Sequence, residues 1–94
     1  MKKATEHFDQ EILDLTQRRG EIYGPPSEDF RRAAAIKTVV AECPDPQLRH
    51  VLEMIGVKMA RLVHTPEHLD SWVDIAGYAR TACMVIDETR DAKD

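Results

Sequence analysis

The stretch HTPEHLDSWVDIAGYARTA, residues 64–82, decides how the second half of the chain is divided into helices. Thr65 and Pro66 predict a helix start, because threonine caps helix N-termini and proline is tolerated at the first helical position. Apolar residues then recur at helical spacing toward the C-terminus. The stretch therefore predicts a helix over residues 66–89.

Three further segments of the chain carry helical periodicity. They predict helices over residues 4–19, 28–42 and 46–64. Gly20 is the expected C-terminal stop of the first helix, and Ser27 the expected N-cap of the second. Asp45 is the expected N-cap of the third, with Pro46 at its first position.

The fold class follows from what these segments contain and lack. No stretch alternates β-branched residues between hairpin turns, so the sequence predicts an all-α four-helix bundle in one domain, residues 1–94. The predicted third and fourth helices are apolar on more than one face, so they are either central or shared with another subunit. We expect a homo-oligomer. The alternative is a monomer in which the first two helices cover both faces.

Composition narrows the classes of function. The 94 residues are 43% hydrophobic and 32% charged, with a net charge of −4, which suits a globular protein and disfavours binding to a nucleic-acid backbone. No apolar run is long enough for a membrane span, and no signal segment opens the chain. Cys43 and Cys83 lack metal-ligand spacing. We expect free thiols and a cytoplasmic protein.

Polar residues of the predicted last helix gather on one face. They are Glu67, Asp70, Asp74, Gly77, Tyr78 and Thr81. Lys58 and Arg61 share a face of the preceding helix. In a structural interpretation, Asp74 pairs with Lys58 or Arg61 and fixes the packing of the two helices. In a functional one, the carboxylates hold Mg²⁺, Lys58 and Arg61 hold phosphate oxygens, and Gly77 admits a ligand.

Other catalytic and metal-binding patterns have less support. His64 and His68 are four residues apart, but the predicted helix start between them separates their faces, so we expect no zinc pair. The chain has no nucleophile elbow, P-loop or Cys-x-x-Cys pair. Neither cysteine has a histidine close in sequence, so a nucleophilic thiol is not expected.

The order of three motifs resembles a known family. RRGEIYGPPSEDFRRAA, MIGVKMARL and HLDSWVDIAGYARTA follow one another along the chain. They are similar to small bacteriophage and prophage proteins that carry a domain of unknown function, DUF6378, over about residues 12–86. If the chain is phage-encoded, the resemblance implies the host cytoplasm as its location.

A more distant resemblance is to the all-α nucleotide pyrophosphohydrolases of the MazG and dCTPase type. In those enzymes carboxylates on two helices hold Mg²⁺ over a triphosphate, and Asp74 followed by Tyr78 matches the later helix. The resemblance implies three groups of site residues. They are the metal ligands Asp70, Asp74 and Glu53, the phosphate ligands Lys58 and Arg61, and the base-binding Tyr78 and Tyr23.

The chain departs from the MazG pattern on its third predicted helix. Glu53 stands alone there, and Val57 and Lys58 occupy the places of the second and third glutamates. The first expectation is a MazG-like phage protein that acts on nucleotides, as a Mg²⁺-dependent nucleoside triphosphate pyrophosphohydrolase. The alternative is a non-catalytic phage protein that binds a nucleotide, another phosphorylated small molecule or a host protein.

Overall fold

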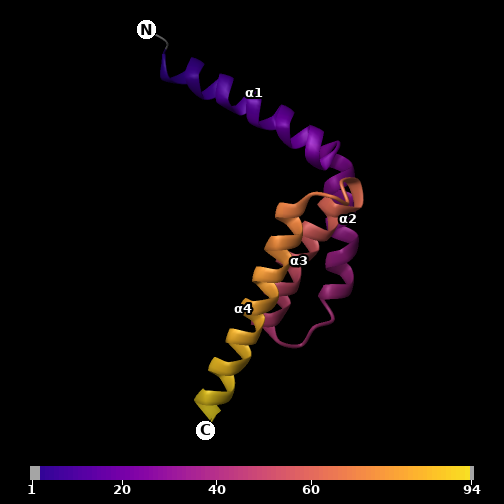
Figure 1. The fold of residues 1–94 in the computed structure, drawn as a ribbon, viewed down its shortest axis with the longest axis vertical. Helices are drawn as coiled ribbons and strands as arrows, with labels where there is room; N and C mark the ends of the chain where they lie inside the picture. The colour runs from indigo at the N-terminus through magenta and orange to yellow at the C-terminus, as the bar shows by residue number, and fades with distance from the viewer. Residues whose placement is uncertain (1–2, 94) are drawn as a thin grey trace.

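The chain is all-α, as predicted from the sequence. The computed structural model describes residues 3–93, with side chains for residues 3–91. These residues form α1 (Ala4–Tyr23), α2 (Pro26–Val40), α3 (Pro46–His64) and α4 (Leu69–Lys93), and they include no strand (Figure 1). Among them, no helix combines the length and the apolar character that crossing a membrane requires.

Helix α3 is the centre of the fold. It packs directly against α2 and against α4, whereas the backbones of α2 and α4 do not approach each other closely among the described residues. Helix α1 touches α2 and α3 only near its C-terminal end and then projects away from them (Figure 1). The radius of gyration is 17.4 Å, whereas a compact domain of this length would have a radius of about 12 Å.

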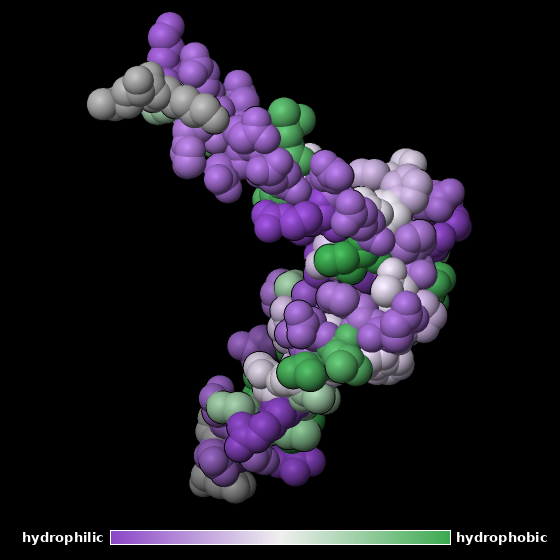
Figure 2. All heavy atoms as spheres, turned by 45° about the horizontal axis from the view of Figure 1, so that its top comes forward, coloured by the Kyte–Doolittle hydropathy of each residue, from purple (hydrophilic) through white to green (hydrophobic). Residues whose placement is uncertain are grey.

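The buried core is small because each helix covers only part of its neighbours. Its buried apolar side chains are Val51, Ala60 and Leu62, all on α3. The accessible surface is 7212 Å², whereas about 5,500 Å² is expected for a compact monomer of this mass. Apolar side chains therefore remain on the surface, over α1 and over the packed helices (Figure 2).

The predicted start of α3, with Asp45 as its N-cap, is confirmed. The Asp45 side chain accepts hydrogen bonds from the backbone N–H groups of Gln47 and Leu48, at 2.9 and 3.0 Å. Pro46 occupies the first helical position, where its missing N–H leaves no bond unmade. Helix α3 ends at His64, as predicted.

The end of α1 differs from the prediction. The helix runs through Gly20 to Tyr23, and Gly24 ends it with φ 78°. A glycine inside a helix costs only about 1 kcal/mol, so Gly20 does not stop it. Gly24 does, because its positive φ breaks the helix and Pro25 follows it.

Two predicted helix starts are wrong by two or three residues. Helix α2 begins at Pro26, with Pro25 as its N-cap, so Ser27 lies inside the first turn. Helix α4 begins at Leu69 rather than at residue 66, and it runs past residue 89 to Lys93. Thr65 does not cap α4, because its hydroxyl donates to the backbone carbonyl of Ile22 on α1.

The turn between α3 and α4 is held by contacts that the sequence did not predict. The indole N–H of Trp72 donates to the carbonyl of Pro66 at 2.8 Å. His68 Nδ1 lies 2.8 Å from the hydroxyl of Ser71, which is almost completely buried. These bonds close the turn on the side of the molecule where α1 ends, and they place His68 near that end.

Candidate functional site

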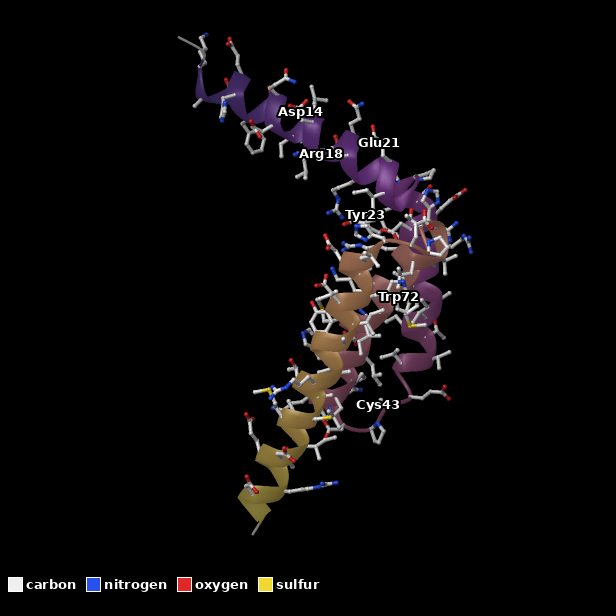
Figure 3. All side chains as sticks on the ribbon, viewed as in Figure 1. Asp14, Arg18, Glu21, Tyr23, Cys43 and Trp72 are labelled. Atoms are coloured by element: carbon white, nitrogen blue, oxygen red, sulfur yellow. The ribbon has the colours of Figure 1, made fainter. Side chains whose placement is uncertain are left out.

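A cluster of polar and aromatic side chains lies where α1 meets α3 and the α3–α4 turn, around Tyr23 (Figure 3). The guanidinium carbon of Arg61, from α3, lies 4.2 Å from the centroid of the Tyr23 ring. That of Arg19, one turn earlier on α1, lies 5.0 Å from it. The His68 ring meets Tyr23 edge-on, with centroids 6.0 Å apart. We call these four residues the Tyr23 cluster.

The backbone at the end of α1 positions this cluster. Gly24 is buried, and a Cβ placed on it would lie 2.8 Å from Cε1 of His64, so only glycine lets α1 end against α3. The hydrogen bond from the Thr65 hydroxyl to the Ile22 carbonyl attaches the same end to the α3–α4 turn. Two contacts thus fix the residue that precedes Gly24, which is Tyr23.

The two arginines of the Tyr23 cluster have no carboxylate partner. The ion pairs among the described side chains join Arg32 to Glu28, His50 to Glu53 and Lys58 to Asp74. Arg61 is half-buried, and its Nε is buried without a hydrogen-bond partner. A guanidinium so placed favours an incoming anion, because burying its charge unpaired is costly.

A buried carboxylate lies beside the same cluster. Asp29, in the first turn of α2, is only 7% exposed, and its Oδ1 has no hydrogen-bond partner. Asp29 lines a cavity of about 260 Å³ together with Arg19, Tyr23 and Phe30. The cavity therefore combines two aromatic rings with one acidic and one basic side chain, a combination that suits a polar ligand with a planar part.

The Lys58–Asp74 pair confirms the structural interpretation of the acidic face. Lys58 Nζ lies 2.9 Å from Asp74 Oδ2, across the interface of α3 and α4. The Lys58 side chain is 16% exposed and that of Asp74 46% exposed. The carboxylate thus compensates a mostly buried ammonium group, and a phosphate at Lys58 or a metal ion at Asp74 would have to compete with this pair.

The three predicted metal ligands do not come together within the chain. Asp70 is exposed on α4, whereas Glu53 lines the groove between α2 and α3 and has His50 Nδ1 3.9 Å away. Among the described residues, no three histidine, cysteine or acidic side chains are close enough to share a metal ion. Asp70, Asp74 and Glu53 are therefore not close enough to share one metal ion in a single copy of the chain.

The predicted base-binding tyrosines lie in different surroundings. Tyr23 is in the cluster with Arg61, which brings one predicted base contact beside one predicted phosphate contact. Tyr78 is half-buried on α4, one turn beyond Asp74. Apart from its two neighbours in sequence and the backbone of α4 itself, no described residue lies within 4 Å of a Cβ placed on Gly77, so the close approach expected there is not made among the described residues. The two histidines have separate roles, His64 at Gly24 and His68 at Ser71.

Sequence reasoning did not assign a role in the site to Arg19 or to Asp29. Arg19 and Tyr23 are four residues apart in RRGEIYG, a spacing that places both on one face once the helix is known to continue through Gly20. In the sequence, Asp29 is a typical acidic residue of a helix N-terminus, like Glu28 beside it. Only its burial in the structure indicates a different role.

Comparison with known proteins identifies a family without a described function. No curated protein and no solved structure shows significant similarity to the chain. The sequence profile of a family described as a domain of unknown function, DUF6378, matches residues 10–86. This match spans all of α2 and α3, with most of α1 and α4, and the chain therefore belongs to the DUF6378 family.

Proposed function

We propose that the chain binds a nucleotide, or another phosphorylated small molecule, at the Tyr23 cluster. The observation that carries the proposal is the presence of two arginines without carboxylate partners at one tyrosine ring, Arg19 and Arg61. Most arginines among the described residues lack a carboxylate partner, and Arg19 is exposed, but Arg61 is half-buried and its Nε is buried without a hydrogen-bond partner. A guanidinium group in that position, beside a second one, favours an anionic ligand.

The neighbouring cavity suggests how the rest of such a ligand is held. Tyr23 and Phe30 offer aromatic faces to a planar base. The cavity of about 260 Å³ is close to the lower end of small-molecule sites. A nucleotide would therefore place its base in the cavity and its phosphates toward Arg61.

The catalytic form of the proposal is a Mg²⁺-dependent pyrophosphohydrolase of the MazG type in a phage or prophage protein. Mg²⁺ usually needs only one or two protein carboxylates, since the phosphates supply further ligands. Asp29 fits that role better than Asp74, because Asp74 is engaged by Lys58. Binding without hydrolysis is the non-catalytic form, and it needs no metal.

The binding test is calorimetric titration of the protein with nucleoside triphosphates and inorganic triphosphate, with and without Mg²⁺. Arg61→Met keeps the aliphatic stem but removes the charge, and we expect a loss of affinity of about tenfold or more. Arg31→Met, at an exposed position on α2, is the matched control and should bind like the native protein. Equal affinity of the Arg61→Met variant and the native protein would refute the site.

An assay for pyrophosphate release from the same nucleoside triphosphates distinguishes the catalytic form of the proposal from the non-catalytic form. If the protein hydrolyses nucleotides, Asp29→Asn should lower the rate by at least about a hundredfold, because a metal ligand acts on the chemical step. Asp70→Asn, at an exposed position, should leave the rate unchanged. Ligand binding with no pyrophosphate release in Mg²⁺ would exclude the pyrophosphohydrolase and leave the non-catalytic form.

A further inference from the structure

Helix α1 carries a mostly apolar seam that is exposed at Phe8, Ile12 and Leu15, where no other described residue covers it. Its members alternate at spacings of four and three residues, as in a coiled coil. They are Phe8, Ile12, Leu15, Arg19 and Ile22. Phe8 is 62% exposed, Ile12 40% and Leu15 43%, and α1 contains no buried residue.

A single amphipathic helix of this kind is not stable alone in water. Most helical stability in proteins comes from packing an apolar face, and isolated helices of this length are marginal even when rich in alanine. Helix α1 has 20 residues, and all of it except its C-terminal end projects away from the other helices (Figure 1). The seam therefore needs a partner helix.

We propose that the partner is α1 of a second copy of this chain, packed antiparallel along the seam. Antiparallel pairing that sets Ile12 against Leu15 of the partner subunit also sets Phe8 against the partner's Arg19. The ring then meets a guanidinium group, a favourable cation–π contact. Parallel pairing would instead place the two copies of Arg19 against each other.

Charges beside the seam favour the same arrangement. Glu11 and Arg18 occupy equivalent flanking positions one heptad apart on α1. In the antiparallel register, Glu11 faces Arg18 of the partner subunit, and the two-fold axis repeats the pair. Shifting the register by one heptad would bring two copies of Arg18 together, or two copies of Glu11. Charge complementarity thus selects one orientation and one register.

The elongated shape of the chain leaves surface that an interface can cover. The accessible surface of the whole chain, 7212 Å², exceeds that of a compact monomer of this mass by about 1,700 Å², and the exposed seam of α1 contributes part of this excess. A standard stable interface takes about 800 Å² from each partner. The pairing also brings an aromatic side chain of the second copy to Arg19, which lines the cavity beside Tyr23. The argument for the dimer does not depend on the proposed ligand.

Sedimentation velocity of the full chain over a wide range of concentration tests the proposal. The native protein should be a dimer, and Ile12→Asp should weaken the dimer at least about a hundredfold, since it buries a charge in the seam. Leu13→Asp is the matched control, because Leu13 is 64% exposed and lies about 140° from the centre of the seam. Circular dichroism should show lost helix only for Ile12→Asp.

A charge exchange tests the orientation. Glu11→Arg and Arg18→Glu should each weaken the dimer by about tenfold, because each creates two like-charge contacts. The double variant should restore the native dissociation constant to within a few fold. A monomeric native protein, equal effects of the residue 12 and residue 13 variants, or a double variant as weak as the single ones would each overturn the proposal.

Discussion

The Lys58 ammonium group and the Asp74 carboxylate, 2.9 Å apart, form the ion pair that joins α3 to α4. The two side chains are unequally buried, and the mostly buried member is the cation. Removing the carboxylate therefore does more harm than its own exposure suggests, because it leaves Lys58 uncompensated.

We expect Asp74→Ala to lower the free energy of unfolding by about 1–2 kcal/mol, a value discounted for the half-exposed carboxylate. Asp70→Ala, one turn earlier and exposed, should change it by less than about 0.5 kcal/mol. Urea unfolding followed by circular dichroism measures both. The two variants would lose stability equally if the pair did not contribute to the interface.

Gly24 and Gly20 offer a second matched comparison. Gly24→Ala should destabilise the chain by about 2 kcal/mol or more, because residue 24 has φ 78° and its new Cβ would meet the His64 ring. Gly20→Ala should stabilise α1 by about 0.5–1 kcal/mol, because open space surrounds a Cβ at that helical position. Thermal unfolding distinguishes them, and a destabilised Gly20→Ala would mean that something approaches α1 there.

The packing of α3 against α2 depends on a glycine as well. A Cβ on Gly56 would lie 2.9 Å from Cγ2 of Ile36, so Gly56→Ala should cost about 1–3 kcal/mol through overpacking. Gly77→Ala, in open space on α4, should be neutral or stabilising by up to about 1 kcal/mol. Chemical denaturation checks both, and a Gly56→Ala variant of native stability would show that Ile36 moves away at little cost.

The Asp45 cap should contribute to the stability of α3. Asp45→Ala removes the acceptor of two backbone N–H groups and should cost about 1 kcal/mol. Asp45→Asn keeps an acceptor oxygen and should cost only a few tenths of a kcal/mol. Unfolding midpoints of the three proteins give the comparison. If Asn and Ala were equally destabilising, the charge at the helix N-terminus, rather than the hydrogen bonds, would be the cause.

The features predicted correctly are those that local chemistry determines. Asp45 and Pro46 sit side by side in sequence, and capping needs nothing beyond the next three residues. The Lys58–Asp74 pair could be predicted from helical periodicity, because each is a charged residue within an apolar stretch of its helix and the two helices face each other. Such features require no knowledge of how distant segments pack.

The features missed depend on contacts between distant segments. Whether Gly20 or Gly24 ends α1 is decided partly by His64, forty residues farther along the chain. The pairing of Thr65 with Ile22, which displaced the predicted start of α4, spans a similar distance. The burial of Asp29 likewise depends on where α1 turns, and no local pattern encodes that direction.

The order of contacts along the chain has a kinetic consequence. Helices α2, α3 and α4 pack with their neighbours in sequence, so they have the low contact order of fast-folding helical proteins. The Thr65–Ile22 hydrogen bond instead closes a separation of 43 residues. We therefore expect the C-terminal end of α1 to dock last during folding and to detach first at low denaturant concentration. Its detachment would disrupt the Tyr23 cluster while α2, α3 and α4 remain folded.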